Sequence, residues 1–124
     1  MAGRAPDRGT DGRDPGRARR LLGLGVRART VIVGVEQVRT AARRGNAVMA
    51  LVADDASEHS RAKVIRLLSA RGVPVTAGVT AAWLGESVGR GATAAVAVVD
   101  GELARGIVEA LGSTPVSRPN GGMG

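Results

Sequence analysis

The sequence predicts an α/β fold in which helices cover both faces of a central sheet. Two uninterrupted apolar runs, residues 47–53 (AVMALVA) and residues 94–99 (AAVAVV), are typical of strands that are buried on both faces. Amphipathic segments with helix-capping signals alternate with these and two shorter strand-like runs. The resulting order, in which five helices alternate with four strands, indicates a layered α/β domain.

Glycines, capping residues and changes of hydrophobic period set the predicted boundaries. In the first predicted helix, residues 17–28, Gly23 and Gly25 each lower the stability of the helix by roughly 1 kcal/mol relative to alanine. Residues 55–58 form a helix-start capping arrangement, and Thr80 and Asp100 fit as further N-caps. The predicted strands are residues 30–33, 47–53, 74–77 and 94–99, and the predicted helices are residues 17–28, 34–45, 55–71, 80–88 and 100–111.

The composition limits the class of protein. A chain of 124 residues forms one domain of ordinary size, and with no Phe, no Tyr and one Trp its core must be aliphatic. The absence of cysteine excludes disulfides, thiolate metal sites and a cysteine nucleophile. No apolar run approaches the roughly 20 residues of a membrane span, and the first residues lack the apolar segment of a signal peptide. We therefore expect a cytoplasmic protein that does not enter a membrane.

The net charge favours a polyanionic partner, since the formal charge is +7 and the pI is about 11.6. Residues 1–20 hold six arginines against three aspartates, which places about half of the excess outside the expected core. Both ends are rich in Gly and Pro and cannot bury enough apolar surface to offset their ordering entropy. We predict a disordered basic tail at residues 1–16, a single domain at residues 17–111 and a disordered tail at residues 112–124.

One predicted helix, from Gly34 to Gly45, carries the densest set of polar groups. At about 100° per residue its apolar side chains share one side, which accounts for its packing. The other side gathers an amide, a carboxylate, a hydroxyl and three guanidinium groups, and is either a solvated surface or a binding face. This polar side consists of Glu36, Gln37, Arg39, Thr40, Arg43 and Arg44.

Seven short motifs occur in the order and spacing of a known family. They are Leu21-Leu22-Gly23-Leu24, Arg27-Ala28, Gly34-x-Glu36-Gln37-Val38, Arg44-Gly45, Ala53-x-Asp55-Ala56-Ser57, Val73-Pro74-Val75 and Leu84-Gly85-x-x-x-Gly89. On these motifs residues 17–111 resemble the L7Ae/L30e ribosomal protein superfamily and, within it, the small bacterial YlxQ-type proteins. The resemblance implies a three-layer α/β/α sandwich with a four-stranded mixed sheet, which is the L30e-like fold.

The resemblance also implies binding to kink-turn RNA, in which an internal loop with sheared G·A pairs bends a duplex sharply. In that family the helix that begins at the position of Gly34 enters the widened groove, and the loop before the position of Leu84 covers an extruded base. The physics fits, because a helix N-terminus attracts phosphate and Glu36 or Gln37 can accept or donate hydrogen bonds at guanine edges. The expected RNA-binding residues are Arg29, Gly34, Glu36, Gln37, Arg39, Thr40, Arg43, Arg44, Val79, Thr80, Ala81 and Leu84.

The chain departs from the family pattern at three places. Glu36-Gln37 stands where the best-known kink-turn binders carry Asn-Glu, although Glu-Gln is usual in the YlxQ-type branch. Thr40 stands where both groups tend to have lysine, and Arg29-Thr30 replaces an expected Gly-Lys. The candidates for the phosphate contacts that the missing lysines would make are arginines at neighbouring positions, Arg29, Arg39, Arg43 and Arg44.

Other motifs support catalysis weakly. Gly23-x-Gly25-x-x-Ala28 has dinucleotide-binding spacing, but no strand precedes it. Asp54-Asp55 has the chemistry to hold Mg²⁺, although helix capping by Asp55 is the simpler explanation. Trp83 is expected to pack in the core, with base stacking as the alternative, and the lone His59 is given no role.

We therefore predict a non-enzymatic protein without cofactor or metal, since no phosphate-cradling lysine loop and no Ser/His/acid constellation occurs. Its expected partner is structured RNA, with ribosomal RNA among the candidates, bound by a monomer through the Gly34–Gly45 helix and the 79–85 loop. The alternative is a small α/β domain that binds a protein or a nucleotide and whose basic tails associate weakly with nucleic acid.

Overall fold

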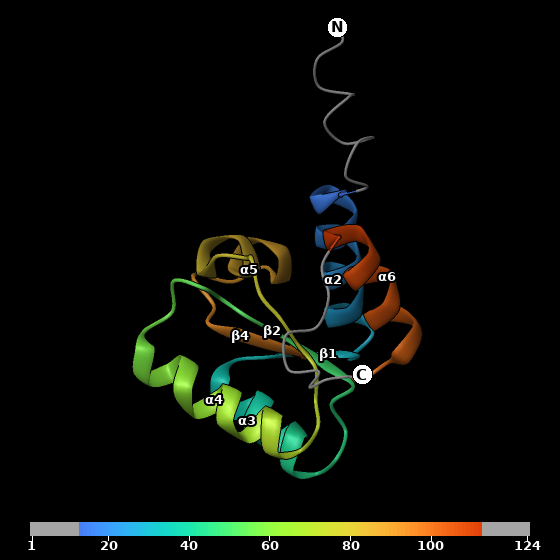
Figure 1. Ribbon diagram of the computed structural model, residues 1–124. Helices are drawn as coiled ribbons and strands as arrows, with labels where there is room; N and C mark the ends of the chain where they lie inside the picture. Colours follow the sequence, from blue (N-terminus) through green and yellow to red (C-terminus); the bar gives the residue numbers. More distant parts are fainter. Residues whose placement is uncertain (1–12, 113–124) are drawn as a thin grey trace, which may run out of the picture.

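Residues 13–112 are described by the computed structural model (Figure 1), and in this range five helices alternate with four strands. The predicted α/β class is confirmed, with no change in the order of the elements. The helices and strands are α2 (Pro15–Arg27), β1 (Val31–Val33), α3 (Val35–Arg43), β2 (Met49–Val52), α4 (Glu58–Ala70), β3 (Val75–Thr76), α5 (Ala81–Val88), β4 (Ala95–Val98) and α6 (Gly101–Leu111).

The four strands form one mixed sheet in the order β1-β4-β2-β3. Strand β4 runs antiparallel to both of its neighbours, whereas β3 runs parallel to β2. Strands β1, β2 and β3 therefore run in the same direction and end at the same edge of the sheet. This arrangement confirms the mixed four-stranded sheet that the family resemblance implied.

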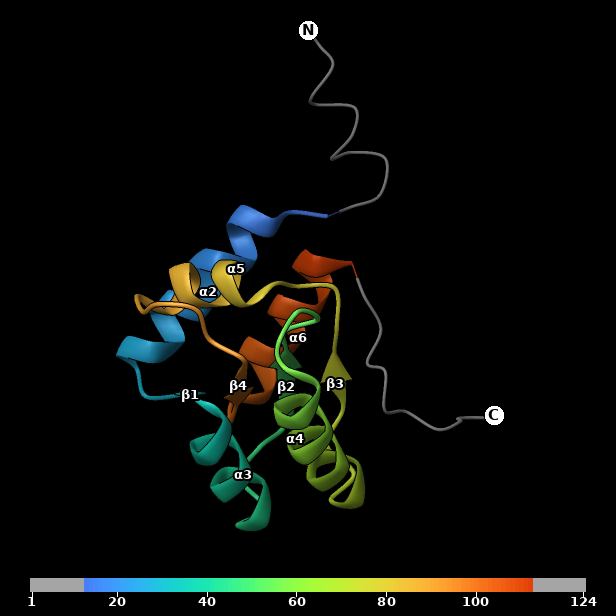
Figure 2. The ribbon, with the colours of Figure 1, turned by 90° about the vertical axis from the view of Figure 1, so that its left-hand side faces the viewer.

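Helices cover both faces of the sheet, with α3 and α4 on one face and α2, α5 and α6 on the other (Figures 1 and 2). The alternation of side chains along the strands divides the core accordingly. In β2, Leu51 belongs to the cluster under α2, α5 and α6, whereas Ala50 belongs to the cluster with Val38 of α3 and Leu68 of α4. The three-layer sandwich is thus confirmed.

Helix α2 begins at Pro15, two residues earlier than predicted. Asp14 caps it, because Oδ1 of Asp14 accepts a hydrogen bond from the Arg17 amide at 3.1 Å. The Asp14 amide also donates to the carbonyl oxygen of Ala110 at 2.6 Å, and proline at the first helical position has no N–H to leave unpaired. The predicted tail of residues 1–16 was therefore too long, because residues 13–16 belong to the domain; residues 1–12 and 113–124 lie outside the described residues.

Two of the predicted caps are confirmed and one is wrong. Thr80 and Asp100 accept hydrogen bonds from the amides of Trp83 and Leu103, at 3.0 Å and 2.8 Å. Helix α4, however, is capped by Ser57, whose Oγ accepts from the Ser60 amide at 3.1 Å, and Asp55 makes a different contact. The strands are shorter than predicted, since β3 pairs through two residues only.

Two of the glycines inside α2, Gly23 and Gly25, play different roles. A Cβ atom at Gly25 would contact Cγ2 of Val31 and would lie 2.7 Å from Cδ2 of Leu103, so glycine allows α2 to approach both β1 and α6. A Cβ atom at Gly23 would meet only the Ser87 carbonyl oxygen, at 3.4 Å. Close packing explains Gly25, whereas the structure gives no steric reason for Gly23.

We predict that Gly25→Ala lowers the free energy of unfolding by about 1–3 kcal/mol, because the added methyl group overpacks the core. The matched variant Gly23→Ala should raise stability by up to about 1 kcal/mol through helix propensity. Urea unfolding of both variants, followed by circular dichroism, measures the difference. Equal effects of the two substitutions would contradict the packing role of Gly25.

Candidate functional site

Three helices begin at the same edge of the sheet. Helices α3, α4 and α5 follow β1, β2 and β3, and these strands all end at this edge. Backbone hydrogen bonds link the segments there: the Gly34 amide donates to the Ala95 carbonyl at 3.0 Å, and the Asp54 amide donates to the Val79 carbonyl at 2.8 Å. The partial positive charges of three helix N-termini therefore lie along one edge of the molecule.

The N-terminus of α3 differs from the others because no side chain caps it. Side chains cap α2, α4, α5 and α6, whereas α3 begins at Gly34 without a side-chain hydrogen bond. Gly34 has φ of +107°, which favours glycine, and a Cβ atom there would lie 2.6 Å from Oε1 of Gln37. The first-turn amides of α3 have no intrahelical partner and are open to an external acceptor.

A shallow groove of about 320 Å³ runs beside α3. It brings together four of the predicted side chains, Glu36, Gln37, Thr40 and Arg44. Sequence reasoning missed the other lining residues, among them Ile32, which lies half-exposed on the edge strand β1, and Asn46, which follows α3. The sequence signal for Ile32 was weak, since an edge position depends on the strand order.

Glu36 is held in an ion-pair network at the mouth of the groove. Nη1 of Arg39 lies 3.0 Å from Oε1 of Glu36, and Nζ of Lys63 on α4 lies 3.5 Å from Oε2. Desolvation raises the pKa of Glu36, but the combined attraction of Arg39 and Lys63 outweighs it and holds the pKa below its ordinary value. The carboxylate therefore stays ionised at neutral pH, and Lys63 joins the site from a helix that the sequence did not connect with it.

The loop between β3 and α5 is fixed by two aspartates. Oδ2 of Asp54 accepts from the Gly78 amide at 3.1 Å, and Oδ1 of Asp55 accepts from the Ala81 amide at 2.8 Å. Sequence reasoning considered Asp55 as a helix cap or as part of a Mg²⁺ site, and found neither of these loop contacts. Within residues 13–112, no group of three His, Cys, Asp or Glu side chains could hold a metal ion.

The predicted residues of this loop are not equally accessible. Thr80 is exposed and Ala81 is half-buried, whereas Val79 and Leu84 are 7% and 0% exposed. The side chains of Val79 and Leu84 therefore support the loop from the core and cannot themselves reach a partner. Gly85 is also structural, because a Cβ atom there would contact the backbone of Gly91.

Three of the predicted arginines, including Arg44 of the groove, lie away from the α3 N-terminus. Arg29 is exposed and precedes β1, so it lies at the other end of this strand from Gly34. Arg43 and Arg44 are at the last turn of α3, where both are exposed. Of the predicted arginines, Arg39 thus contacts a first-turn residue, Glu36, whereas the other three lie away from the start of α3.

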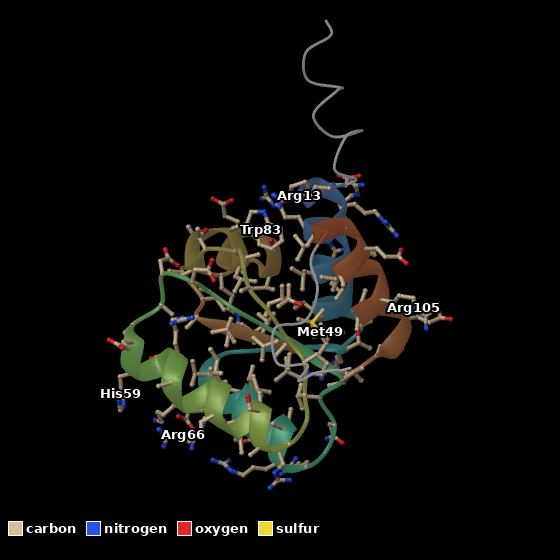
Figure 3. All side chains as sticks on the ribbon, in the orientation of Figure 1. Arg13, Met49, His59, Arg66, Trp83 and Arg105 are labelled. Atoms are coloured by element: carbon tan, nitrogen blue, oxygen red, sulfur yellow. The ribbon has the colours of Figure 1, made fainter. Side chains whose placement is uncertain are left out.

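Trp83, for which packing and base stacking were both considered, and His59, which was given no role, lie outside the groove (Figure 3). Trp83 is half-buried and, with Arg13, Thr80 and Leu111, lines a separate cavity of about 420 Å³ between α5, the start of α2 and the end of α6. His59 is exposed on α4 and points away from the domain.

No helix within residues 13–112 is both long enough and apolar enough to cross a membrane.

A mixed sheet in the order β1-β4-β2-β3, with two helices on one face and three on the other, defines a class of small three-layer α/β/α proteins. Residues 17–108 match the ribosomal protein L7Ae/L30e/S12e/Gadd45 family, and the chain belongs to this family. The resemblance read from the seven sequence motifs is therefore confirmed.

Individual relatives agree with this assignment. The chain is 35% identical over 91 residues to the RNA-binding protein YlxQ of Bacillus subtilis (strain 168), a match that covers 73% of this chain and 91% of that protein. A solved structure of a protein of unknown function from Bacillus halodurans C is similar with a TM-score of 0.69 and 27% identity, and the match covers 74% of this chain and 93% of that chain.

We predict that Asp55→Ala releases the start of α5, because the Ala81 amide loses its acceptor. The stability cost should be about 0.5–2 kcal/mol, the usual range for a lost helix-terminal hydrogen bond. Amide hydrogen exchange measured by NMR should accelerate at Ala81, whereas Glu58→Ala, a change at a nearby exposed carboxylate, should leave this exchange unchanged. Unaltered protection in Asp55→Ala would show that the aspartate does not hold the loop.

Proposed function

We propose that this chain is a non-enzymatic RNA-binding protein that docks structured RNA on the α3 groove. The observation that carries the proposal is the groove itself, which begins with Glu36 and Gln37 beside a helix N-terminus without a side-chain cap and follows α3 to Arg44 at the other end of the helix. Membership of a ribosomal protein family and the similarity to an RNA-binding relative support the nature of the partner.

The α3 N-terminus offers the chemistry that an RNA backbone needs. Unpaired first-turn amides and the helix dipole favour a phosphate oxygen near Gly34. The Gln37 amide lies next to Gly34 and carries both donors and an acceptor, so it can pair with a base edge close to that phosphate. The combination favours a position where an RNA strand departs from regular duplex geometry, because base edges are poorly accessible in a continuous A-form helix.

The loop at residues 78–81 is the second proposed contact. Its backbone is held by Asp54 and Asp55, so the exposed Thr80 is presented in a fixed position at the same edge of the sheet as Gly34. The two carboxylates oppose phosphate binding near α5, whereas the carboxylate nearest the α3 N-terminus, that of Glu36, is paired with two cations. This difference in local charge favours the backbone at α3 and an uncharged base at the loop.

Kink-turn RNA is the proposed class of partner, with weaker binding than in family members that carry lysine at the position of Thr40. Thr40 is exposed and lines the groove, but its short side chain cannot reach a phosphate as a lysine can. The negative charge of Glu36 is less of an obstacle than its sequence position suggests, because Arg39 and Lys63 offset it within the protein.

We predict that Thr40→Lys strengthens binding to a kink-turn RNA by about 1–3 kcal/mol, because the new ammonium group forms a charge-assisted hydrogen bond inside the groove. A straight duplex should gain only a smaller, salt-sensitive part of this energy. Fluorescence titration of both RNAs at two salt concentrations measures the difference.

A matched control adds the same charge elsewhere. Leu24 is 55% exposed on α2, on the other face of the sheet, so Leu24→Lys should change the affinity for the two RNAs equally and slightly. Equal gains on kinked and straight RNA with Thr40→Lys would refute kink recognition by the groove. Failure of the unmodified protein to bind either RNA would refute the proposed function as a whole.

The charge distribution does not favour the alternative function, a small protein- or nucleotide-binding domain whose basic tails associate weakly with nucleic acid. Residues 1–12 contain two arginines and two aspartates, and residues 113–124 contain one arginine, so the ends contribute +1 of the total charge of +7. The other arginines of the first 20 residues belong to the described domain, and three of them, Arg17, Arg19 and Arg20, lie in α2. Residues 13–112 therefore carry +6 of the total charge of +7.

We predict that deletion of residues 1–12 changes RNA affinity less than about twofold and leaves its salt dependence unchanged, because the deleted segment carries no net charge. Thermal stability should also be preserved, since Asp14 and Pro15 remain to start α2. Binding isotherms over a series of salt concentrations provide the measurement. A decrease of the salt slope by one unit or more would restore a direct role for the tail.

A further inference from the structure

Basic side chains continue from α3 onto α4, beyond the groove that the proposed function uses. Residues 37–53 and residues 59–85 contain no aspartate or glutamate. We call the basic surface that these two stretches contribute the α3–α4 face. Its cations are Arg39, Arg43, Arg44, Arg61, Lys63, Arg66 and Arg71.

Contacts at both ends of the two helices keep these cations together. Near the start of the helices, Nζ of Lys63 lies 3.5 Å from the Glu36 carboxylate. Near their ends, Nη1 of Arg71 donates to the carbonyl oxygen of Arg43 at 2.8 Å. Helices α3 and α4 therefore lie side by side and run in the same direction, as Figures 1 and 2 also show.

The charges of this face are largely unopposed. Figure 3 shows Arg66 pointing away from the sheet, and it makes no ion pair within residues 13–112. On the opposite face, α2 also carries four arginines, of which Arg19 pairs with Glu86 of α5. The helix packed beside it, α6, carries two glutamates and one arginine, so the cations of that face do not extend over two neighbouring helices. An array of like charges on two packed helices produces a positive potential that a polyanion would neutralise.

We propose that the α3–α4 face binds the phosphate backbone of a double-stranded RNA stem that leaves the α3 groove. This inference rests on the proposed function, because RNA docked at the start of α3 would bring the stem onto the neighbouring helix. A duplex backbone fits the face, since it requires rows of cations rather than aromatic or base-reading side chains. With 13 residues, α4 is about 20 Å long and can follow several consecutive phosphates.

The test removes two cations from the part of the face that the groove does not use. Arg66→Gln combined with Arg71→Gln should weaken binding to a kink-turn RNA with a long stem roughly five- to twentyfold and reduce the salt slope by about 1.4–1.8. The same variant should bind normally to an RNA whose stem is cut to about 4 base pairs, because at no more than about 3.4 Å per pair this stem is shorter than α4. Both side chains are exposed, so the loss of the surface hydrogen bond from Arg71 to the Arg43 carbonyl should not unfold the domain.

A matched control removes two exposed arginines from the other face of the sheet, by Arg20→Gln and Arg105→Gln. This control should leave the binding of both RNAs nearly unchanged. Equal losses in the two double variants, or equal losses on long and short stems, would overturn the proposal. A loss confined to the long stem supports it whatever the result for Thr40→Lys, so the two proposals can fail separately.

Discussion

The position of β4 between β1 and β2 determines how the rest of the molecule is arranged. Because β4 is antiparallel to both neighbours, β1 and β2 run in the same direction, and β3 joins them in parallel. Parallel strands must be connected by crossovers, which here are the helices α3 and α4. Both crossovers therefore lie on one face of the sheet and begin at one edge, and this places the groove and the α3–α4 face next to each other.

The small side chains of the central strands allow this arrangement. Ala50 of β2 and Ala95 and Ala97 of β4 belong to the cluster that packs against α3 and α4, whereas Val96 and Val98 of β4 face the other three helices. Alanine on the first face brings α3 and α4 close to the sheet without aromatic side chains. Each fully buried aliphatic residue of this core contributes roughly 1.5–3 kcal/mol, so many modest contributions replace a few large ones.

Much of the fold could be predicted because its local signals are strong. The runs around β2 and β4 are typical of strands buried on both faces, and Thr80 and Asp100 each have one helix start to cap. Asp55 was misassigned because Asp55 and Ser57 are equally suitable caps by sequence. The choice between them depends on the Ala81 amide, which is 26 residues away in the chain.

Only those residues of the candidate site that lie on the single helix α3 could be predicted from the sequence. Glu36, Gln37 and Thr40 share a face by helical periodicity, and the structure gathers them in one groove. Ile32 and Lys63 come from other elements, so no local pattern connects them with the groove. Leu84 was placed in the RNA-binding set through its family position, but burial decides the accessibility of a side chain, and Leu84 is completely buried.

The start of α3 has no side-chain cap, and both Gly34 and Glu36 contribute to this. Gly34 has no side chain to cap the helix, and its own amide is already bonded to Ala95. The Glu36 carboxylate could otherwise turn toward the first-turn amides, but Arg39 and Lys63 hold it. The ion pairs that lower the pKa of Glu36 thus also keep its carboxylate from capping the first turn, and Oε1 of Gln37 lies beside Gly34 instead.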